Sequence, residues 1–234
     1  MMTVIDFFCG AGGFSEGFRQ AGFDVIWAVD LWQLAVDTHR ANHPDCITIR
    51  EDVISLSNLS DDKFDELIPD SDIIVGSPPC TAFSNSNRSG KGDKKKGVEL
   101  IEAYLRIVAR KKFKKNSQLK YWILENVPQA QSFIKPVYKA SDLGLKGNFS
   151  LHTIGDNSGV YDAKYFGVPS SRQRFFCGDF PRPAPTIRKD EELIPLKNIT
   201  GALGSPMEKL HTNITDPIYG FSFKGEDVTD HHYV

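Results

Sequence analysis

The chain alternates short apolar runs with segments whose apolar residues recur at helical spacing, and this alternation limits the possible folds more than any other feature. Alternating strands and helices are typical of an α/β protein, because parallel neighbouring strands need a crossover connection. We therefore predict a doubly wound, mostly parallel sheet. Strands are expected near residues 3–8, 24–29, 46–50, 72–76, 120–124, 149–155 and 173–179, and helices near 14–21, 31–42, 60–68, 98–115 and 128–142.

The first strand-like run leads into a glycine-rich turn. Gly10, Gly12 and Gly13 allow a tight turn and a close approach of the backbone to a ligand. The turn does not match the full glycine spacing of a dinucleotide-binding motif. The sequence also lacks a P-loop lysine, which argues against a triphosphate ligand. The second run ends at Asp30, roughly 20 residues after the glycines, which is the spacing of an acid that binds the ribose of a nucleoside cofactor.

A cysteine follows the fourth run. The apolar residues 73–75 lead through Gly76, Ser77, Pro78 and Pro79 to Cys80, and ligands of open α/β sheets bind beyond the carboxyl ends of such strands. The two prolines fix φ and disfavour helix before them, so they form a stiff support for the thiol. Taken alone, the segment also fits a buried, inert cysteine in a proline-rich turn.

Five features together resemble the motifs of the cytosine-C5 DNA methyltransferase family, both in their residues and in their order along the chain. They are the glycine-rich turn, Asp30, Asp52, Pro79-Cys80 and the segment Glu125-Asn126-Val127. The resemblance runs from about Val4 to Gly178. It implies a class I, Rossmann-like methyltransferase fold with S-adenosyl-L-methionine as cofactor and S-adenosyl-L-homocysteine as product. In the family the glycine loop surrounds the methionine end of the cofactor, the acid matched by Asp30 takes the ribose, and the acid matched by Asp52 reads the adenine amine. The implied cofactor set also includes Phe8, Gly10, Gly12, Gly13, Pro79 and Leu100, although Leu100 belongs to an apolar helical pattern typical of a core.

The resemblance also implies a catalytic set. The thiolate of Cys80 would add to C6 of cytosine, since only the ionised thiol attacks. Glu125 would contact N3 and the exocyclic amine, which requires a carboxyl pKa raised by burial. Arg172 and Arg174 match the arginines of a Gln-x-Arg-x-Arg segment that supports the catalytic loop and holds cytosine O2, whereas Ser170 stands in place of the glutamine. Without the resemblance, Glu125 fits a surface glutamate and the arginines fit a strand with one solvated face.

Double-stranded DNA is the implied substrate, and its target base would have to be flipped out of the stack. Residues 85–97 are rich in glycine and lysine and have no apolar periodicity, which predicts a loop whose cations contact phosphates on closure. A charged loop is more often simply solvated. The net charge of −2 means that DNA binding must depend on a local basic patch.

Prolines at 181, 183, 185 and 195 mark a change of character, so we predict a catalytic domain over 1–180 and a partial target-recognition region over 181–234. The last motifs of the family are not found, which leaves three explanations: a split enzyme with a second polypeptide, a truncated chain, or a degenerate homologue. The sequence shows no signal peptide or membrane-spanning run. The cysteines lack metal-ligand spacing, so we expect a cytoplasmic protein without a metal, in which Cys9, Cys46 and Cys177 pack as small apolar residues.

Two other functions stay open from the sequence. A tRNA cytosine-C5 methyltransferase would share Cys80 and Glu125, but its usual Cys-Phe-Thr motif is missing. A catalytically inactive regulatory homologue would keep the fold. Intact Cys80, Glu125 and Arg174 argue against a loss of chemistry.

Overall fold

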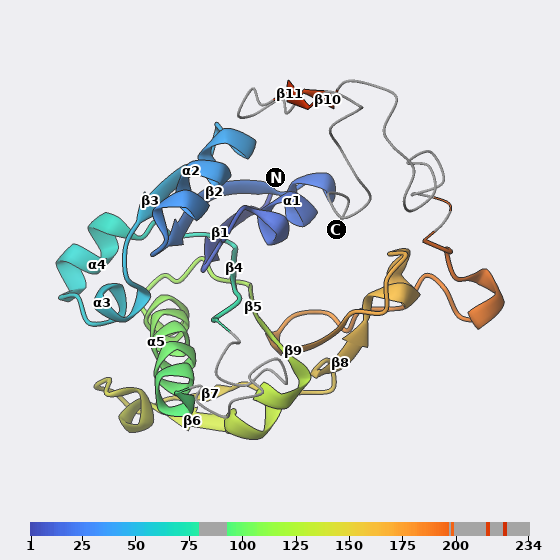
Figure 1. Cartoon of the computed structure of the whole chain (residues 1–234). Coiled ribbons are helices and arrows are strands. Elements are labelled where there is room, and N and C mark those ends of the chain that lie inside the picture. Colours follow the sequence, from blue (N-terminus) through green and yellow to red (C-terminus); the bar gives the residue numbers. More distant parts are fainter. Residues whose placement is uncertain (80–92, 197, 199–213, 216–221, 224–234) are drawn as a thin grey trace. The chain divides into compact units, whose positions relative to one another are not determined.

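The computed structural model describes residues 1–79, 93–196, 198, 214–215 and 222–223 (Figure 1). Their contacts divide the chain into two units. Unit 1 comprises Met1–Asp162 and Arg172–Ala184, and unit 2 comprises Ala163–Ser171 and Pro185–Val234. Within the described residues, no helix has the length and apolar character needed to cross a membrane.

Unit 1 is built on a seven-stranded sheet with the strand order β3-β2-β1-β4-β5-β9-β8. The first five strands are parallel, and β9 and β8 run antiparallel to their neighbours. This confirms the predicted mostly parallel sheet. The strands are β1 (Thr3–Phe7), β2 (Asp24–Asp30), β3 (Ile47–Arg50), β4 (Ile73–Gly76), β5 (Tyr121–Asn126), β8 (Gly159–Asp162) and β9 (Gln173–Asp179).

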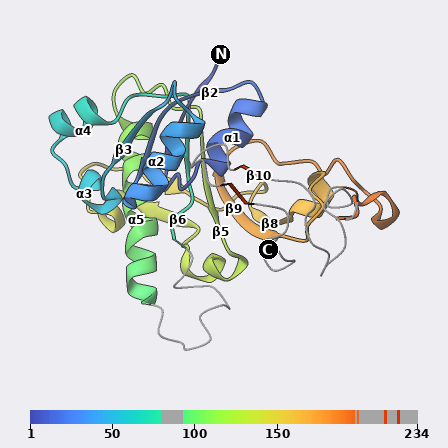
Figure 2. The same cartoon turned by 45° about the horizontal axis from the view of Figure 1, so that its top comes forward.

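Helices cover both faces of this sheet. Figures 1 and 2 show α1 and α5 on opposite sides of the strands. Residues of α1 pack with Val4, Ala28 and Val75, whereas α5 packs on the face that carries Phe7 and Trp122. The helices are α1 (Gly13–Gln20), α2 (Gln33–Asn42), α3 (Val53–Ser57), α4 (Asp61–Leu67) and α5 (Lys94–Phe113).

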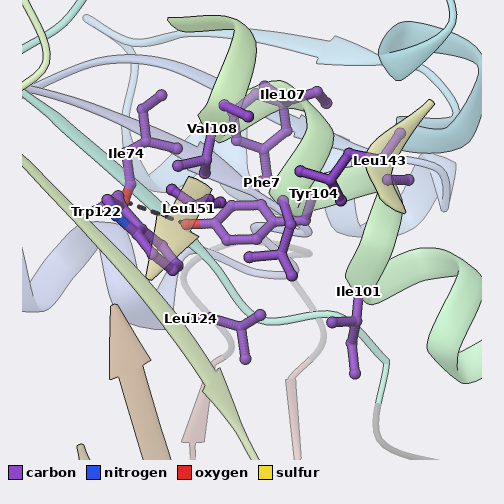
Figure 3. Close-up of a cluster of buried hydrophobic side chains, with 14 of the residues drawn as sticks. Phe7, Ile74, Ile101, Tyr104, Ile107, Val108, Trp122, Leu124, Leu143 and Leu151 are labelled. Carbon is purple, nitrogen blue, oxygen red and sulfur yellow. Dashed lines mark hydrogen bonds between the residues drawn. The ribbon is translucent and has the colours of Figure 1, made fainter. Parts of the chain in front are cut away.

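The larger core lies between α5 and the sheet (Figure 3). Tyr104 is fully buried there, and its hydroxyl donates to the carbonyl oxygens of Ile123 at 2.6 Å and Ile74 at 3.3 Å. A Cβ on Gly76 would lie 2.4 Å from the Tyr104 ring, so glycine at the end of β4 lets the ring close against the strand. The hydroxyl bonds join β4 to β5 immediately before the segments that carry the candidate site.

The segment 128–142 differs from the predicted helix. It forms two 3₁₀ turns, η1 (Pro128–Phe133) and η2 (Ala140–Leu143), separated by the strand β6 (Val137–Lys139). Pro136 explains the difference, because a proline lacks an N–H and disfavours helix at the residue before it. The predicted strand 149–155 is shorter, as β7 (Ser150–His152), and pairs with β6 in a separate antiparallel ribbon.

Helix α5 begins at Lys94, four residues before its predicted start, because Asp93 caps it. The Asp93 side chain accepts hydrogen bonds from the backbone N–H groups of Lys95 at 3.0 Å and Lys96 at 3.1 Å. Lys94, Lys95 and Lys96 are therefore helical and not part of the predicted loop. In unit 1, α3 and β8 were not predicted either.

The basic carboxyl end of α5 forms an ion-pair cluster. Lys111 is 3% exposed and lies 3.2 Å from Asp65 and 3.0 Å from Asp70. The other pairs of this α5 ion-pair cluster are Arg110–Asp61 at 2.7 Å, Lys112–Asp179 at 2.6 Å and Lys114 with Asp70 at 2.7 Å and with Asp65 at 3.3 Å. The cluster fixes α5 to α4, to the segment that follows α4 and to the end of β9.

Unit 2 has little regular structure among its described residues. The carbonyl oxygen of Tyr165 accepts hydrogen bonds from the N–H groups of Thr186 and Ile187, both at 3.0 Å, and the Tyr165 hydroxyl donates to Asp190 at 3.1 Å. Its elements are η3 (Ala163–Phe166), η4 (Asp190–Glu192) and the antiparallel pair β10 (Ile214–Thr215) and β11 (Ser222–Phe223).

Candidate active site

The candidate site follows the carboxyl edge of the parallel strands. Phe7 at the end of β1 lies beside Val29 of β2 and Gly76 of β4, and Gly76 lies beside Leu124 of β5. The segments after these strands therefore meet at one edge. The chain also changes direction across the sheet between β1 and β4, and ligands of open α/β sheets bind at such a switch point. The candidate residues lie along this edge in the order of the strands: Asp52, Asp30, the glycine loop 8–13, residues 77–79, Glu125 and Asn126.

The glycine loop is held from both neighbouring strands. The N–H of Cys9 donates to Val29 O at 3.1 Å, and the N–H of Ser77 donates to Phe7 O at 3.2 Å. Phe8 has a φ of 59°, a left-handed conformation that non-glycine residues seldom adopt. Such backbone persists only where surrounding contacts fix it, and it concentrates at functional sites.

Asp30 joins this loop to the end of β2. Its Oδ2 accepts from the N–H of Gly10 at 3.0 Å, and its Oδ1 accepts from the N–H of Trp32 at 2.9 Å. One carboxylate thus positions the glycine loop and the start of α2 together. A ligand bound at this loop would lie beside a negative charge.

Gly12 lets the loop approach α2 closely. Its φ is 97°, and a Cβ there would lie 2.5 Å from Nε2 of His43. Its carbonyl oxygen accepts from the N–H of Glu16 at 2.8 Å, which starts α1, and lies 3.3 Å from the same His43 nitrogen. No other residue fits this position without displacing His43.

The charge around the loop suits a ligand with hydrogen-bond donors and a positive charge. Asp6 lies fully buried on β1, and its Oδ1 has no hydrogen-bond partner in the part of the chain that the structure describes. Burial raises the Asp6 pKa to about 7, and the charge of Asp30 adds to that effect. Burial likewise raises the pKa of the Cys9 thiol far above its ordinary value, which makes it an inert side chain.

Asp52 and Leu100 occupy different surroundings. The Asp52 side chain caps α3 by accepting from the N–H of Ile54 at 3.1 Å. It follows β3 at the same edge, as predicted for an adenine-binding acid. Leu100 is a partly buried residue of α5 and does not follow a strand. The roles of both residues toward a cofactor stay predictions.

Cys80 lies outside the described residues, but its support is described. The side-chain N–H of Asn126 donates to Pro78 O at 2.9 Å, and its Oδ1 accepts from the N–H of Val127 at 2.8 Å. Asn126 is 1% exposed. The end of β5 therefore holds the proline segment that leads to Cys80. The sequence alone assigned no role to Asn126, although it belongs to the motif Glu125-Asn126-Val127. Its position next to Glu125 was the one indication of a role at the site.

Glu125 and Arg174 form an ion pair at the same edge. Nε of Arg174 lies 3.0 Å from Oε1 of Glu125, and the two side chains are 23% and 21% exposed. Burial raises the pKa of Glu125, against the opposing charges of Arg174 and Arg172. Because β9 is antiparallel, it begins at the edge where the parallel strands end, so Arg172 and Arg174 arrive there from a distant part of the sequence.

Arg172 has a more exposed position. Its backbone N–H donates to Asp162 Oδ1 at 3.1 Å, which ties the start of β9 to the end of β8. The structure thus brings Glu125, Arg172 and Arg174 together. Ser170, which stands where the glutamine was expected, belongs to unit 2.

Comparison with known proteins identifies the family of this chain. The model of the C-5 cytosine-specific DNA methylase family matches residues 2–216. The chain belongs to this family. Relatives of this chain include the Type II methyltransferase M1.HphI of Haemophilus parahaemolyticus, 32% identical over 197 residues that cover 79% of this chain and 50% of the relative. Another is M.XorII of Xanthomonas oryzae pv. oryzae, 32% identical over 73% of this chain and 38% of the relative.

Solved structures share the fold of this family member. A prophage-encoded E. coli protein assigned as a DNA modification methyltransferase matches 92% of this chain and 59% of its own, with a TM-score of 0.60 and 24% identity. The Dnmt2 methyltransferase of S. pombe matches 85% of this chain and 60% of its own, with a TM-score of 0.53 and 21% identity. The chain spans half or less of the length of the two Type II relatives.

Proposed function

We propose that this chain carries the catalytic part of a DNA (cytosine-5-)-methyltransferase, which transfers a methyl group from S-adenosyl-L-methionine to C5 of a cytosine flipped out of duplex DNA. One observation carries the proposal: the Glu125–Arg174 pair and the Asn126-held proline segment lie at the edge that also carries the glycine loop. The carboxyl, the support of the candidate nucleophile and the candidate cofactor loop are thus neighbours. The matching family supports DNA, and not tRNA, as the substrate.

In this proposal Cys80 adds to C6 of the flipped base as a thiolate and leaves when the C5 proton is lost. Addition pushes negative charge onto the ring at N3. Glu125 stabilises that charge by donating a proton or hydrogen bond, and its raised pKa favours the protonated form that can donate. Arg174 lies beside this carboxyl and supplies a positive charge toward cytosine O2, with Arg172 as the second cation.

The residues of the glycine loop fit the proposed cofactor. S-adenosyl-L-methionine supplies an activated methyl group on a sulfonium, and its ribose offers hydroxyl donors. Asp30 would accept from the ribose, Asp52 from the adenine amine, and the buried carboxylate of Asp6 adds negative potential below the loop. The remaining proposed contacts come from Phe8, Gly10, Gly12, Gly13, Pro79 and Leu100.

The proposed enzyme needs protein segments beyond those of this chain. Because the Type II relatives extend well beyond the matched part, we propose that base recognition and full activity need additional segments, in the same polypeptide or in a second one. We also propose a reducing, cytoplasmic environment, in which Cys80 stays a thiol. The described cysteines, Cys9, Cys46 and Cys177, are free and buried.

A covalent trap tests the proposal. Duplex DNA containing 5-fluorocytosine cannot lose a proton at C5, so the enzyme should remain attached at C6 in the presence of the cofactor. With the additional segment supplied, we expect a denaturant-stable complex with the wild type and with the Cys177→Ser control, and none with Cys80→Ser. A complex of equal yield with Cys80→Ser would contradict the assignment of the nucleophile.

A further inference from the structure

A buried chain of hydrogen bonds lies beneath the glycine loop, and we call it the Asp6 chain. The hydroxyl of Ser15 on α1 lies 2.7 Å from Oδ2 of Asp6, and Nε2 of His39 on α2 lies 3.0 Å from Oγ of Ser15. Nδ1 of His39 lies 2.8 Å from Oγ1 of Thr48 on β3. Asp6, Ser15 and His39 are fully buried and Thr48 is 4% exposed. Four elements thus converge on one carboxylate.

When Asp6 is ionised, every hydrogen bond of the Asp6 chain is donated in the direction of its carboxylate. Burial lowers the pKa of His39 to about 4, so its ring is neutral at pH 7 and carries one N–H. Thr48 then donates to Nδ1 of His39, Nε2–H of His39 donates to Ser15, and Ser15 donates to Asp6. The Cys46 thiol hydrogen bonds to Thr48 at the far end. Each donor has an acceptor, so the hydrogen bonding is arranged for a carboxylate.

The charge of that carboxylate is not compensated. Among the described residues no lysine or arginine pairs with Asp6, and its Oδ1 accepts no hydrogen bond. The groups that face it are acids or are neutral. They are Asp30 of β2, Cys9 of the loop, Ser15 of α1, His39 of α2, Cys46, which precedes β3, and Tyr104 of α5. Beyond His39 lies His43, whose ring centroid is 4.6 Å from that of His39.

Burial and Asp30 therefore oppose the ionisation for which the hydrogen bonds are arranged. These two effects place the pKa of Asp6 at about 7, where a modest added potential changes its charge. A positive charge bound at the loop would favour the carboxylate, because Coulomb energies are large where water is excluded.

We propose that Asp6 releases a proton when a cationic methyl donor binds at the glycine loop, and keeps it when the neutral product binds, so that Asp6 helps the protein to distinguish the two by charge. The inference rests on the proposed use of S-adenosyl-L-methionine. The O–H bond of the Asp6 carboxyl breaks, the proton passes to the solvent, and the electron pair stays on the carboxylate beside the bound sulfonium. The thioether of S-adenosyl-L-homocysteine carries no such charge.

The two ligands should consequently differ in the pH dependence of their affinity. Below the Asp6 pKa of about 7, donor affinity should rise by up to about tenfold per pH unit, and it should level off above that pH. Affinity for the product should lack this component. Ser15→Ala removes the hydrogen bond that favours the carboxylate, so it should raise the Asp6 pKa and move the donor's rise to higher pH.

Calorimetry with the whole chain tests the inference without any turnover. Each ligand is titrated in phosphate and in imidazole buffer, whose ionisation enthalpies differ, so that the difference in heat reports the protons released. We expect the wild type at about pH 6.5 to release more protons with the donor than with the product. Asp6→Asn has no proton to release there, so the difference should disappear while both ligands still bind.

The outcomes separate the inference from the proposed function. Equal proton release with the two ligands in the wild type, which needs no variant, would overturn the inference alone. A donor–product difference that persists in Asp6→Asn would also overturn it. Failure of both ligands to bind the wild type would contradict the proposed cofactor and, with it, this inference.

Discussion

The side-chain amide of Asn126 donates to the carbonyl oxygen of Pro78 at 2.9 Å, so the end of β5 holds the chain two residues before Cys80. Asn126 neighbours Glu125, and the same short segment therefore carries the candidate acid and supports the candidate nucleophile. A shift in this hydrogen bond would move both groups relative to each other. Positioning errors of this kind reduce rate even when binding is retained.

Asn126→Asp should slow formation of the Cys80 adduct, because an aspartate cannot donate to Pro78 and would leave a buried acceptor facing another acceptor. We expect a reduction of roughly 10-fold to 100-fold in the single-turnover rate, the range that a lost hydrogen bond of about 1–3 kcal/mol allows. The matched control is Asn157→Asp, since Asn157 donates in the same way to Gly178 O at 3.1 Å, away from the carboxyl edge. Equal rates in the two variants would refute the positioning role.

Glu125→Gln should slow methyl transfer by about 100-fold or more while DNA binding is retained, given the usual size of acid–base contributions. Single-turnover assays with tritiated cofactor, together with DNA-binding isotherms, separate the two effects. Glu66→Gln in α4 removes an equal charge from an exposed position and should have no effect. Unchanged turnover in Glu125→Gln would remove this residue from the catalytic set.

Arg174→Gln should move the pH profile of that reaction. Its positive charge lowers the Glu125 pKa against the raising effect of burial, so its removal raises that pKa further. If the protonated carboxyl is the active form, activity is lost as pH rises through this pKa. The alkaline limb should therefore shift to higher pH in Arg174→Gln, even though the maximal rate falls. A limb that stays in place would show that another group titrates.

Asp30→Asn should weaken cofactor binding by about 1–3 kcal/mol, the range for a lost charge-assisted hydrogen bond. Part of the loss should come from the glycine loop, because Oδ2 of Asp30 also holds the N–H of Gly10. Calorimetry measures the affinity. Asp24→Asn removes an exposed carboxylate at the opposite end of β2 and serves as the control. Equal affinities would count against a role for Asp30.

His39 should make the fold sensitive to acid. Its folded pKa of about 4 lies below the ordinary value of 6.5, so the unfolded chain takes up a proton first as pH falls. The free energy of unfolding should therefore decrease by up to about 3 kcal/mol between pH 6.5 and 4, and not change from this source above 6.5. Asp6 acts oppositely, because its folded pKa of about 7 lies above 3.8 and its contribution falls as pH rises between those values. Because the two contributions overlap between pH 4 and 6.5, denaturant unfolding of the wild type is compared with that of His39→Gln at each pH. The difference between their free energies of unfolding should change by about 3 kcal/mol over this range, since only the wild type carries the His39 contribution.

The 234-residue chain alone should give weak or no sequence-specific methyl transfer. This expectation follows from the relatives, of which the chain spans 50% for M1.HphI and 38% for M.XorII. Supplying the additional segment, fused or as a separate polypeptide, should restore tritiated methyl transfer to duplex DNA. Strong, sequence-specific activity of the chain by itself would contradict the proposal.

The sequence predicts the edge of the sheet better than it predicts the connections. Asp30 and Glu125 could be placed because each ends an apolar run, and parallel strands bring such ends together. The helix predicted over 128–142 was wrong. The prediction followed the helical spacing of the apolar residues and gave too little weight to Pro136, whose missing N–H breaks a helix. Strand β8 has no fully buried residue, so its sequence gives no apolar alternation to detect.

The Asp6 chain could not be predicted from spacing. Its members come from β1, α1, α2 and β3, and the order in which they touch is set by how the helices pack on the sheet. Individually, Ser15 and Thr48 are ordinary polar residues, and His39 fits an exposed helix position. Their burial and their contacts with one another depend on the packing of the helices on the sheet, which the spacing of residues in the sequence does not predict.

The α5 ion-pair cluster has a consequence for how the protein meets DNA. A run of lysine and arginine usually binds phosphates and displaces the counterions condensed on the duplex, which makes affinity fall steeply with salt. In residues 110–114 the cations are already matched by carboxylates of the same chain, so this run displaces few counterions. Substituting Lys112 should consequently leave the slope of affinity against salt concentration unchanged. The basic carboxyl end of α5 thus stabilises the fold, and attraction to the polyanion has to come from other surfaces.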